Sequence, residues 1–285
     1  MIRKDAVWLI TGCSKGLGRA LAEQVIAAGY RVVATARREA DVAEFAAAHP
    51  DAALAVALDV TNKAQITAAV AAAEKRFGAV DVLVNNAGYG YLAAIEEGED
   101  EEVRALFETD LFGPLNLVKS VLPGMRARRR GHIVNISSVG GLLTYPGVGY
   151  YHMVKFGLEA MSDTLAKEVA PLGIGVTAVA PGAFRTEFRG PESIKQSAAV
   201  IDDYAVTAGR ARANTQAGHR KQAGDPVRGA RAIIAALEAE RPPVHLLIGG
   251  DALDQWRVRL DTWRQEIDAW EAVTRGTDLA SAGPD

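Results

Sequence analysis

The chain has little cysteine and no long apolar run. Cys13 is the one cysteine among 285 residues, which excludes an intrachain disulfide and a cage of cysteines around a metal ion. No apolar run approaches the roughly 18–20 residues that span a bilayer, so we expect no membrane partner. The first residues, MIRKDAVWLITGCSKG, contain only a short apolar run before turn residues, unlike a secretory signal peptide. These absences predict a cytoplasmic protein.

The chain also lacks an excess of basic charge. Its formal net charge at pH 7 is −3 and its isoelectric point is near 6.0, so we expect no surface for nucleic acid or for an anionic membrane. The histidines show no spacing typical of metal ligands, and we predict no metal site. A soluble protein that acts on a small molecule fits these limits.

Short apolar runs alternate with longer helical patterns along most of the chain. Hydrophobic residues make up 49% of the sequence, enough for a packed core. The expected strands lie at 6–10, 31–35, 54–58, 80–84, 132–137, 174–180 and 244–249. The expected helices include 17–28, 62–77, 99–126 and 150–170. Nearly continuous apolar strands are typical of parallel sheets covered on both faces. The pattern predicts an α/β, doubly wound parallel sheet of about seven strands, a Rossmann fold in a single domain with a C-terminal helical extension.

Two segments depart from this alternation. Residues 187–224 have weak periodicity, and we predict that they form a lid over the substrate, within a dinucleotide-binding and catalytic domain at 1–250. Residues 251–285 form an amphipathic helix and tail. Leu253, Trp256, Leu260, Trp263, Ile267 and Trp270 recur there at spacings of three and four. We expect this helix to dock on the body of the protein or across a dimer.

A glycine-rich turn, TGCSKGLGR at 11–19, follows the first expected strand and opens the first helix. Gly12, Gly16 and Gly18 are spaced like a dinucleotide fingerprint, in which glycines let the backbone approach a pyrophosphate at a helix N-terminus. The predicted contacts in this turn are Gly12, Ser14, Lys15, Gly16, Leu17 and Gly18. Cys13 is either an inert small residue or a thiol whose pKa the helix N-terminus lowers.

The end of the second strand indicates which dinucleotide is bound. NAD-binding proteins place a carboxylate about 20 residues after the glycines to hold the ribose 2′-hydroxyl. Here the strand ends at Ala36 and is followed by Arg37 and Arg38, while Lys15 adds a cation in the turn. Guanidinium groups suit a 2′-phosphate, so we predict NADP(H). The alternative is that these bases are solvated and that the protein is NAD-linked.

Tyr151 and Lys155 are four residues apart in YYHMVKFG, at the start of an expected helix, and so share one face. A nearby ammonium favours the phenolate and lowers the pKa of a tyrosine from its usual value near 10. This pair predicts a general acid/base that exchanges a proton with a carbonyl or alcohol oxygen.

Five ordered motifs together resemble the single-domain short-chain dehydrogenases/reductases over roughly residues 5–250. They are TGCSKGLG at 11–18, NNAG at 85–88, Ser138 in NISS, the pair Tyr151 and Lys155, and PGAFRT at 181–186. The resemblance implies that Lys155 also binds the nicotinamide ribose and that Ser138, with Ser137 as the alternative, positions the substrate oxygen. It further implies cofactor contacts at Asp59, Val60, Asn86, Ala87, Gly88, Pro181, Gly182 and Thr186.

The sequence departs from the family at one catalytic position. The family usually has asparagine where TDLFG places Asp110, which we count among the catalytic residues. An ionised Asp110 would stabilise the Lys155 ammonium but partly cancel its effect on Tyr151. We therefore expect a higher pKa for Tyr151 than asparagine would give.

The predicted function is an NADP(H)-dependent oxidoreductase that interconverts an apolar or aromatic ketone or aldehyde and its alcohol. The residues expected around the substrate are Tyr89, Tyr91, Leu142, Leu143, Tyr145, Phe184 and Phe188. The alternative is a catalytically idle NADP(H)-binding sensor or scaffold. The resemblance also implies a homodimer or homotetramer formed through the helices near 99–126 and 150–170.

Overall fold

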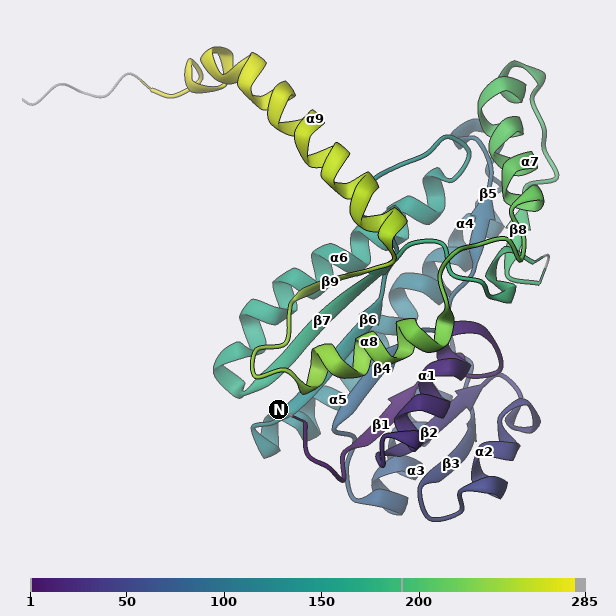
Figure 1. Cartoon of the computed structure of the whole chain (residues 1–285), viewed down its shortest axis with the longest axis vertical. Coiled ribbons are helices and arrows are strands. Elements are labelled where there is room, and N and C mark those ends of the chain that lie inside the picture. The colour runs from purple at the N-terminus through teal and green to yellow at the C-terminus, as the bar shows by residue number, and fades with distance from the viewer. Residues whose placement is uncertain (1, 191, 280–285) are drawn as a thin grey trace, which may run out of the picture.

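The computed structural model describes residues 2–190 and 192–279. Seven parallel strands form one sheet in the order β3-β2-β1-β4-β6-β7-β9 (Figure 1). Their bounds are β1 Val7–Ile10, β2 Arg31–Ala36, β3 Ala53–Ala57, β4 Val82–Asn85, β6 Gly131–Ile136, β7 Ile174–Pro181 and β9 His245–Ile248. The predicted strands are confirmed, and the order reverses between β1 and β4, where a doubly wound sheet opens a crevice.

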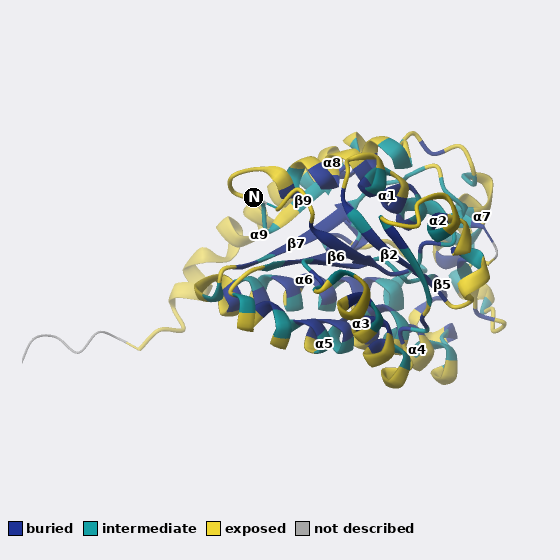
Figure 2. Cartoon of the chain, turned by 90° about the horizontal axis from the view of Figure 1, so that it is seen from below, coloured by how far each residue is buried: buried dark blue, intermediate teal, exposed yellow. Residues whose placement is uncertain are grey.

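Helices cover both faces of the sheet (Figure 2). Their bounds are α1 Gly16–Ala27, α2 Ala43–Ala48, α3 Lys63–Phe77, α4 Asp100–Phe107, α5 Gly113–Arg128, α6 Gly149–Val169, α7 Arg210–Ala217, α8 Pro226–Glu238 and α9 Gly250–Arg275. Alternate residues of β1 point to opposite faces. Trp8 packs in the core beneath α1 and α8, and Leu9 packs in the core against α3, α5 and α6. The predicted α/β Rossmann fold is confirmed.

The predicted helix 99–126 is interrupted. It divides into α4 and α5, separated by a π-helical segment at Glu108–Phe112. Pro114 lies at the start of α5 and has no backbone N–H, so it cannot donate to the carbonyl of Asp110 as an uninterrupted α-helix requires. Asp110 therefore lies in the π-helical segment between α4 and α5, outside both regular helices.

The segment predicted as a lid, 187–224, is partly regular. Its strand β8, Ile194–Gln196, pairs in parallel with β5, Gly90–Leu92, in a separate two-stranded sheet. Helix α7 follows a second π-helical segment, Ala205–Gly209. Pro191 of this segment lies outside the described residues.

The C-terminal helix α9 extends away from the sheet, with its far end free of the body (Figure 1). Only Ala252 in its first turn is buried. The expected docking on the body is therefore wrong beyond that turn, and docking across a dimer stays a prediction. Residues 280–285 of the predicted 251–285 extension lie outside the described residues, and the division at residue 250 stays a prediction. In the described part of the chain, no helix combines the length and apolarity needed to cross a bilayer.

A buried ion pair ties α7 to the rest of the chain. The Glu97 carboxylate accepts hydrogen bonds from Arg212, at 2.6 and 3.2 Å, and from the backbone N–H groups of Ala94 and Ile201. The Arg212 guanidinium holds the pKa of Glu97 at about 2, well below its ordinary value. The lid segment is thus anchored by a fully paired carboxylate.

Replacing Arg212 with methionine should lower the free energy of unfolding by about 3–5 kcal/mol, because it leaves a buried carboxylate without its counter-ion. The pair stabilises the fold fully above the ordinary pKa of about 4.5, and that stability is lost as pH falls towards about 2. The difference between wild type and Arg212→Met in chemical denaturation should therefore shrink over that interval. Arg210→Met is the control, since Arg210 is exposed on the same helix; an equal loss in both variants would contradict the assignment.

Candidate functional site

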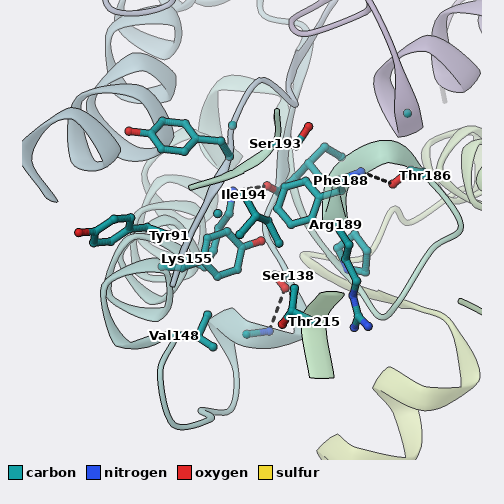
Figure 3. Close-up of a pocket in the computed structure, with 18 of the residues that line it drawn as sticks. Tyr91, Ser138, Val148, Lys155, Thr186, Phe188, Arg189, Ser193, Ile194 and Thr215 are labelled. Carbon is teal, nitrogen blue, oxygen red and sulfur yellow. Dashed lines mark hydrogen bonds between the residues drawn. The ribbon is translucent and has the colours of Figure 1, made fainter. Parts of the chain in front are cut away.

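One large cavity, of about 1360 Å³, lies at the carboxyl ends of the strands. It runs from the glycine-rich turn to Tyr151 and the lid segment, and Figure 3 shows part of its wall. The predicted residues that line it are Gly12, Ser14, Lys15, Gly16, Leu17, Arg37, Asp59, Val60, Asn86, Ala87, Gly88, Ser138, Tyr151, Lys155, Pro181, Gly182 and Thr186. Gly18, Arg38 and Asp110 are not part of the wall. The sequence motifs thus converge on a single site.

The glycine-rich turn needs its glycines for two different reasons. Gly12 and Gly16 have φ angles of +72° and +65°, in the left-handed region that favours glycine. A Cβ atom at Gly18 would lie 2.2 Å from Nδ2 of Asn86, so Gly18 instead permits close packing of α1 on the loop after β4. Gly18 therefore does not line the cavity but allows the glycine-rich turn to pack against Asn86.

Thr11 joins the two loops at the crevice, a role that the sequence analysis missed. Its Oγ1 accepts hydrogen bonds from the backbone N–H groups of Asn86 and Ala87, each at 2.9 Å. The Asn86 side chain donates back to the carbonyl oxygens of Thr11 and Gly12 at 2.8 and 3.2 Å. The only signal was the position of a threonine directly before the first glycine. These bonds fix the glycine turn against the loop after β4.

The three predicted cations differ in their surroundings. Arg37 lines the cavity and, among the described residues, has no ion-pair partner. Arg38 points away and pairs with Asp41 at 2.6 Å. Lys15 lines the cavity but pairs with Glu192 of the lid segment at 2.9 Å. Arg37 is therefore the candidate for a 2′-phosphate, and the structure does not bring Arg38 to the site.

Cys13 is buried and inert. Its Sγ donates to the carbonyl oxygen of Ile10 at 3.2 Å, and burial raises the pKa of the thiol to about 12. The possibility of a lowered thiol pKa at this helix N-terminus is wrong, because the side chain points into the core.

Lys155 is the centre of a buried polar cluster. Its Nζ lies 3.3 Å from the carbonyl oxygen of Ile136, 3.3 Å from Oδ2 of Asp110 and 5.5 Å from the ring centre of Tyr151. Oδ1 of Asp110 accepts from the N–H of Tyr89 at 3.1 Å. The side chains of Asp110 and Lys155 are 0% and 7% exposed, so the pair is shielded from water. Tyr151 and Lys155 thus face the cavity together, as predicted.

Burial and the neighbouring charges shift the pKa values of this cluster in opposite directions. Burial raises the pKa of Tyr151, and Asp110 raises it further, while Lys155 and a hydrogen bond with Ser138 lower it. Lys155 thus lowers the pKa of Tyr151 as expected, but burial and Asp110 outweigh it, and the net direction in the chain alone is upward. Burial would lower the pKa of Lys155, but Asp110 and Tyr151 reverse this and raise it. Burial also raises the pKa of Asp110, against the pull of Lys155.

Ser138 rather than Ser137 faces Tyr151. Its Oγ accepts from the N–H of Gly140 at 3.0 Å (Figure 3), and its hydroxyl is the serine partner of Tyr151. Ser137 is buried and its Oγ has no partner among the described residues. The neighbouring Tyr150 donates to the carbonyl oxygen of Ile95 at 2.5 Å, outside the cavity wall.

His152 supports the loop that carries Ser138. Nδ1 lies 2.7 Å from the carbonyl oxygen of Gly140, and Nε2 lies 2.9 Å from the backbone N of Tyr145. The tautomer with its proton on Nδ1 satisfies both contacts. Burial lowers the pKa of His152, which favours this neutral form.

A second set of buried polar groups lies behind the site. The Nδ2 of Asn85 donates to Oδ1 of Asn135, and Nδ2 of Asn135 donates to Ser162, both at 2.8 Å. Ser162 donates to the carbonyl oxygen of Leu158 at 2.6 Å. These bonds join β4, β6 and α6, and no motif or spacing in the sequence marks these three side chains as partners.

The predicted substrate residues are mostly in place. Tyr89, Tyr91, Tyr145, Phe184 and Phe188 line the cavity. Leu142 and Leu143 do not, and their prediction is wrong: Leu143 packs with Val139 and Ala252 beneath the start of α9. The wall also contains Arg189, which together with Arg185 leaves a phosphate or carboxylate on the substrate open from the sequence, although Arg185 is not part of the wall. Thr215, Asp251 and Gln255, from the lid and α9, line it too and gave no sequence signal.

The comparisons with known proteins identify the family. The model of the short chain dehydrogenase family matches residues 6–197. The chain belongs to the short-chain dehydrogenase family. It is therefore an oxidoreductase, of a family whose members bind nicotinamide cofactors.

Individual relatives cover nearly all of this short-chain dehydrogenase. A short-chain dehydrogenase from Streptomyces avermitilis is 46% identical, with a TM-score of 0.90, over 98% of this chain and 100% of that one. The oxidoreductase BOA17 of Botryotinia fuckeliana is 35% identical over 87% of this chain and 90% of its own length. A short-chain dehydrogenase/reductase from Burkholderia phymatum, solved in complex with NAD, is 27% identical, with a TM-score of 0.82, over 93% of this chain and 97% of that one.

Replacing Asp110 with asparagine should lower the pKa of Tyr151, because it removes a negative charge that disfavours the phenolate. Asparagine keeps an oxygen that can accept from the N–H of Tyr89. Alkaline titration of ring-¹³C-labelled tyrosine by NMR measures the change. Asp163→Asn, an exposed position on the same helix as Tyr151, should leave the titration unchanged. Identical Tyr151 curves for Asp110→Asn and wild type would refute the assignment.

Proposed function

We propose that this short-chain dehydrogenase interconverts an apolar or aromatic ketone or aldehyde and its alcohol with NADP(H), and that Tyr151 is the general acid/base. The observation that carries the proposal is that Tyr151, Lys155 and Ser138 meet in one cavity that continues to the glycine-rich turn. A cytoplasmic location and assembly as a homodimer or homotetramer are part of the same proposal.

The wall of the cavity fits a dinucleotide. Gly12 and Gly16 carry no side chains, so the backbone of the turn can approach a pyrophosphate in front of the N-terminus of α1. Thr186 lies across from Gly16, 3.5 Å from where a Cβ of Gly16 would be, so the loop after β7 closes over the turn. Asp59 and Val60 line the opposite end, where an adenine would lie. When bound, the nicotinamide supplies or accepts the hydride.

Tyr151 moves the proton in this mechanism. In reduction its hydroxyl gives a proton to the carbonyl oxygen, and in oxidation its phenolate takes the alcohol proton. Ser138 hydrogen-bonds the same oxygen and sets its position. Lys155 stabilises the phenolate by its charge, while Asp110 keeps Lys155 protonated at the expense of part of that effect.

The substrate chemistry is proposed from the rings around Tyr151. Phe188 lies with its ring centre 6.1 Å from that of Tyr151, and Tyr145 packs 5.6 Å from His152. These rings favour a flat or apolar group next to the reacting carbon. Arg189 and Thr215 also line the cavity and would meet a polar group of the substrate (Figure 3).

The Tyr151→Phe variant should lose activity by roughly 10²–10⁴-fold, since general acid–base catalysis contributes about that much. The measurement is NADPH oxidation against a panel of apolar ketones and aldehydes. Tyr150→Phe should keep full activity, because its hydroxyl lies outside the cavity wall. Full turnover by Tyr151→Phe would exclude the mechanism. NADPH binding by the parent without turnover on the whole panel would favour the idle sensor or scaffold.

The Arg37→Asp variant should weaken NADPH binding on the order of 10–100-fold, since a hydrogen bond to a charged group contributes roughly 1.5–3 kcal/mol. NADH binding should change much less, and calorimetric titration of both cofactors measures the difference. Arg38→Asp is the matched control, because Arg38 faces Asp41 outside the cavity. Unchanged NADPH affinity in Arg37→Asp would support the NAD-linked alternative.

A further inference from the structure

Helix α9 begins against the body of the protein and then leaves it. Asp251 accepts from the N–H of Ala183 at 2.8 Å, and Ala252 is buried with Leu143 and Leu247. From there the helix projects away from the sheet, and its surface is exposed along most of its length (Figures 1 and 2).

The projecting part carries an apolar seam, which we define as Leu253, Trp256, Leu260, Trp263, Ile267 and Trp270. Spacings of three and four residues place these side chains on one stripe of the helix. Ile267 and Trp270 are 66% and 64% exposed, and even Trp263, whose ring lies under the guanidinium of Arg259 at 4.5 Å, is 38% exposed. Large apolar side chains in a continuous exposed stripe mark an interaction surface.

We propose that this seam pairs antiparallel with the same seam of a second copy of the chain. An antiparallel arrangement about a two-fold axis between Leu260 and Trp263 closes the seam completely. Leu260 then packs on Trp263 of the partner subunit, and Trp256 packs on Ile267 of the partner subunit. Leu253 packs on Trp270 of the partner subunit, so no seam residue is left without an apolar partner.

The charges beside the seam favour the antiparallel direction. On one flank, Arg259 comes opposite Glu266 of the partner subunit, and the two-fold axis repeats this attractive pair. Arg257 comes near Arg264 of the partner subunit on the other flank, where Asp261 already pairs with Arg264 at 3.2 Å within the helix.

A parallel, in-register pair would instead oppose like charges on both flanks. Arg259 would face Arg264 of the partner subunit, and Glu266 would face Glu271 of the partner subunit. The parallel form therefore has no attractive flank, whereas the antiparallel form has one.

The antiparallel pair also separates the two bodies. Leu253 and Trp270 are 17 positions apart, which corresponds to about 26 Å along a helix. The bodies therefore lie at opposite ends of the paired helices. This contact is separate from the α4–α5 and α6 surfaces proposed for the family assembly, and it does not depend on the catalytic proposal.

Cysteine cross-linking tests the direction. Leu253→Cys and Trp270→Cys proteins, mixed and mildly oxidised, should form a disulfide between chains, because the pair brings these positions within the roughly 7 Å between Cα atoms that a disulfide allows. Each single variant alone should stay uncross-linked, since its own position recurs about 26 Å away. Cys13 does not interfere, because it is buried with a thiol pKa of about 12. Cross-linking of Trp270→Cys alone, or none in the mixture, would overturn the proposal.

The assembly itself is tested by Trp263→Glu, which places a charge at the centre of the seam. Sedimentation velocity should show a smaller particle than wild type at micromolar concentration. Val258→Glu introduces the same charge on the opposite side of the helix, where Val258 is 67% exposed, and should leave the mass unchanged. Circular dichroism and NADPH binding confirm that both variants are folded. An unchanged mass for Trp263→Glu would also overturn the proposal.

Discussion

A buried ammonium group would cost several kilocalories per mole without a counter-ion, and Lys155 lies buried at the base of the cavity. Asp110 offsets that cost from 3.3 Å, and Asp110 in turn is held by the N–H of Tyr89. The pair draws three parts of the chain together: the start of α6, the loop after β4 and the irregular turn between α4 and α5. A Cβ at Gly88 would lie 2.7 Å from Oδ2 of Asp110, so the loop passes directly over the carboxylate. The ion pair of Lys155 and Asp110 thus fixes these three parts of the chain at the base of the cavity.

Asp110 has two opposed effects on the neighbouring side chains. The carboxylate that makes the buried Lys155 tolerable also opposes ionisation of Tyr151, since a negative charge nearby disfavours a second one. A tyrosine held above its ordinary pKa stays protonated near neutral pH, so the proton is present on Tyr151, although the phenol is a weaker acid than an ordinary tyrosine. Within the chain alone Tyr151 therefore keeps its hydroxyl proton, and a positive charge nearby would favour the phenolate.

Sequence patterns predicted the features that repeat. The strands were correctly placed because burial on both faces leaves continuous apolar runs, and the glycine turn and the Tyr151–Lys155 pair follow fixed spacings. The misses arose from tertiary packing. The interruption at Glu108–Phe112 depends on one missing N–H at Pro114, within a stretch whose periodicity reads as one helix. Leu143 and Cys13 turn into the core rather than towards the cavity or the helix N-terminus. Thr11 acts through a hydroxyl that no spacing rule marks.

The start of α9 has a consequence for where this protein can be cut or joined to another. Asp251 and Gln255 belong to the cavity wall, and Gln255 accepts a hydrogen bond from Tyr145. Asp251 also fixes the loop after β7 through Ala183. A truncation after β9 would therefore remove part of the cavity wall, and a fusion joined there would disturb it. The cavity wall thus continues past the last strand into the first turns of α9.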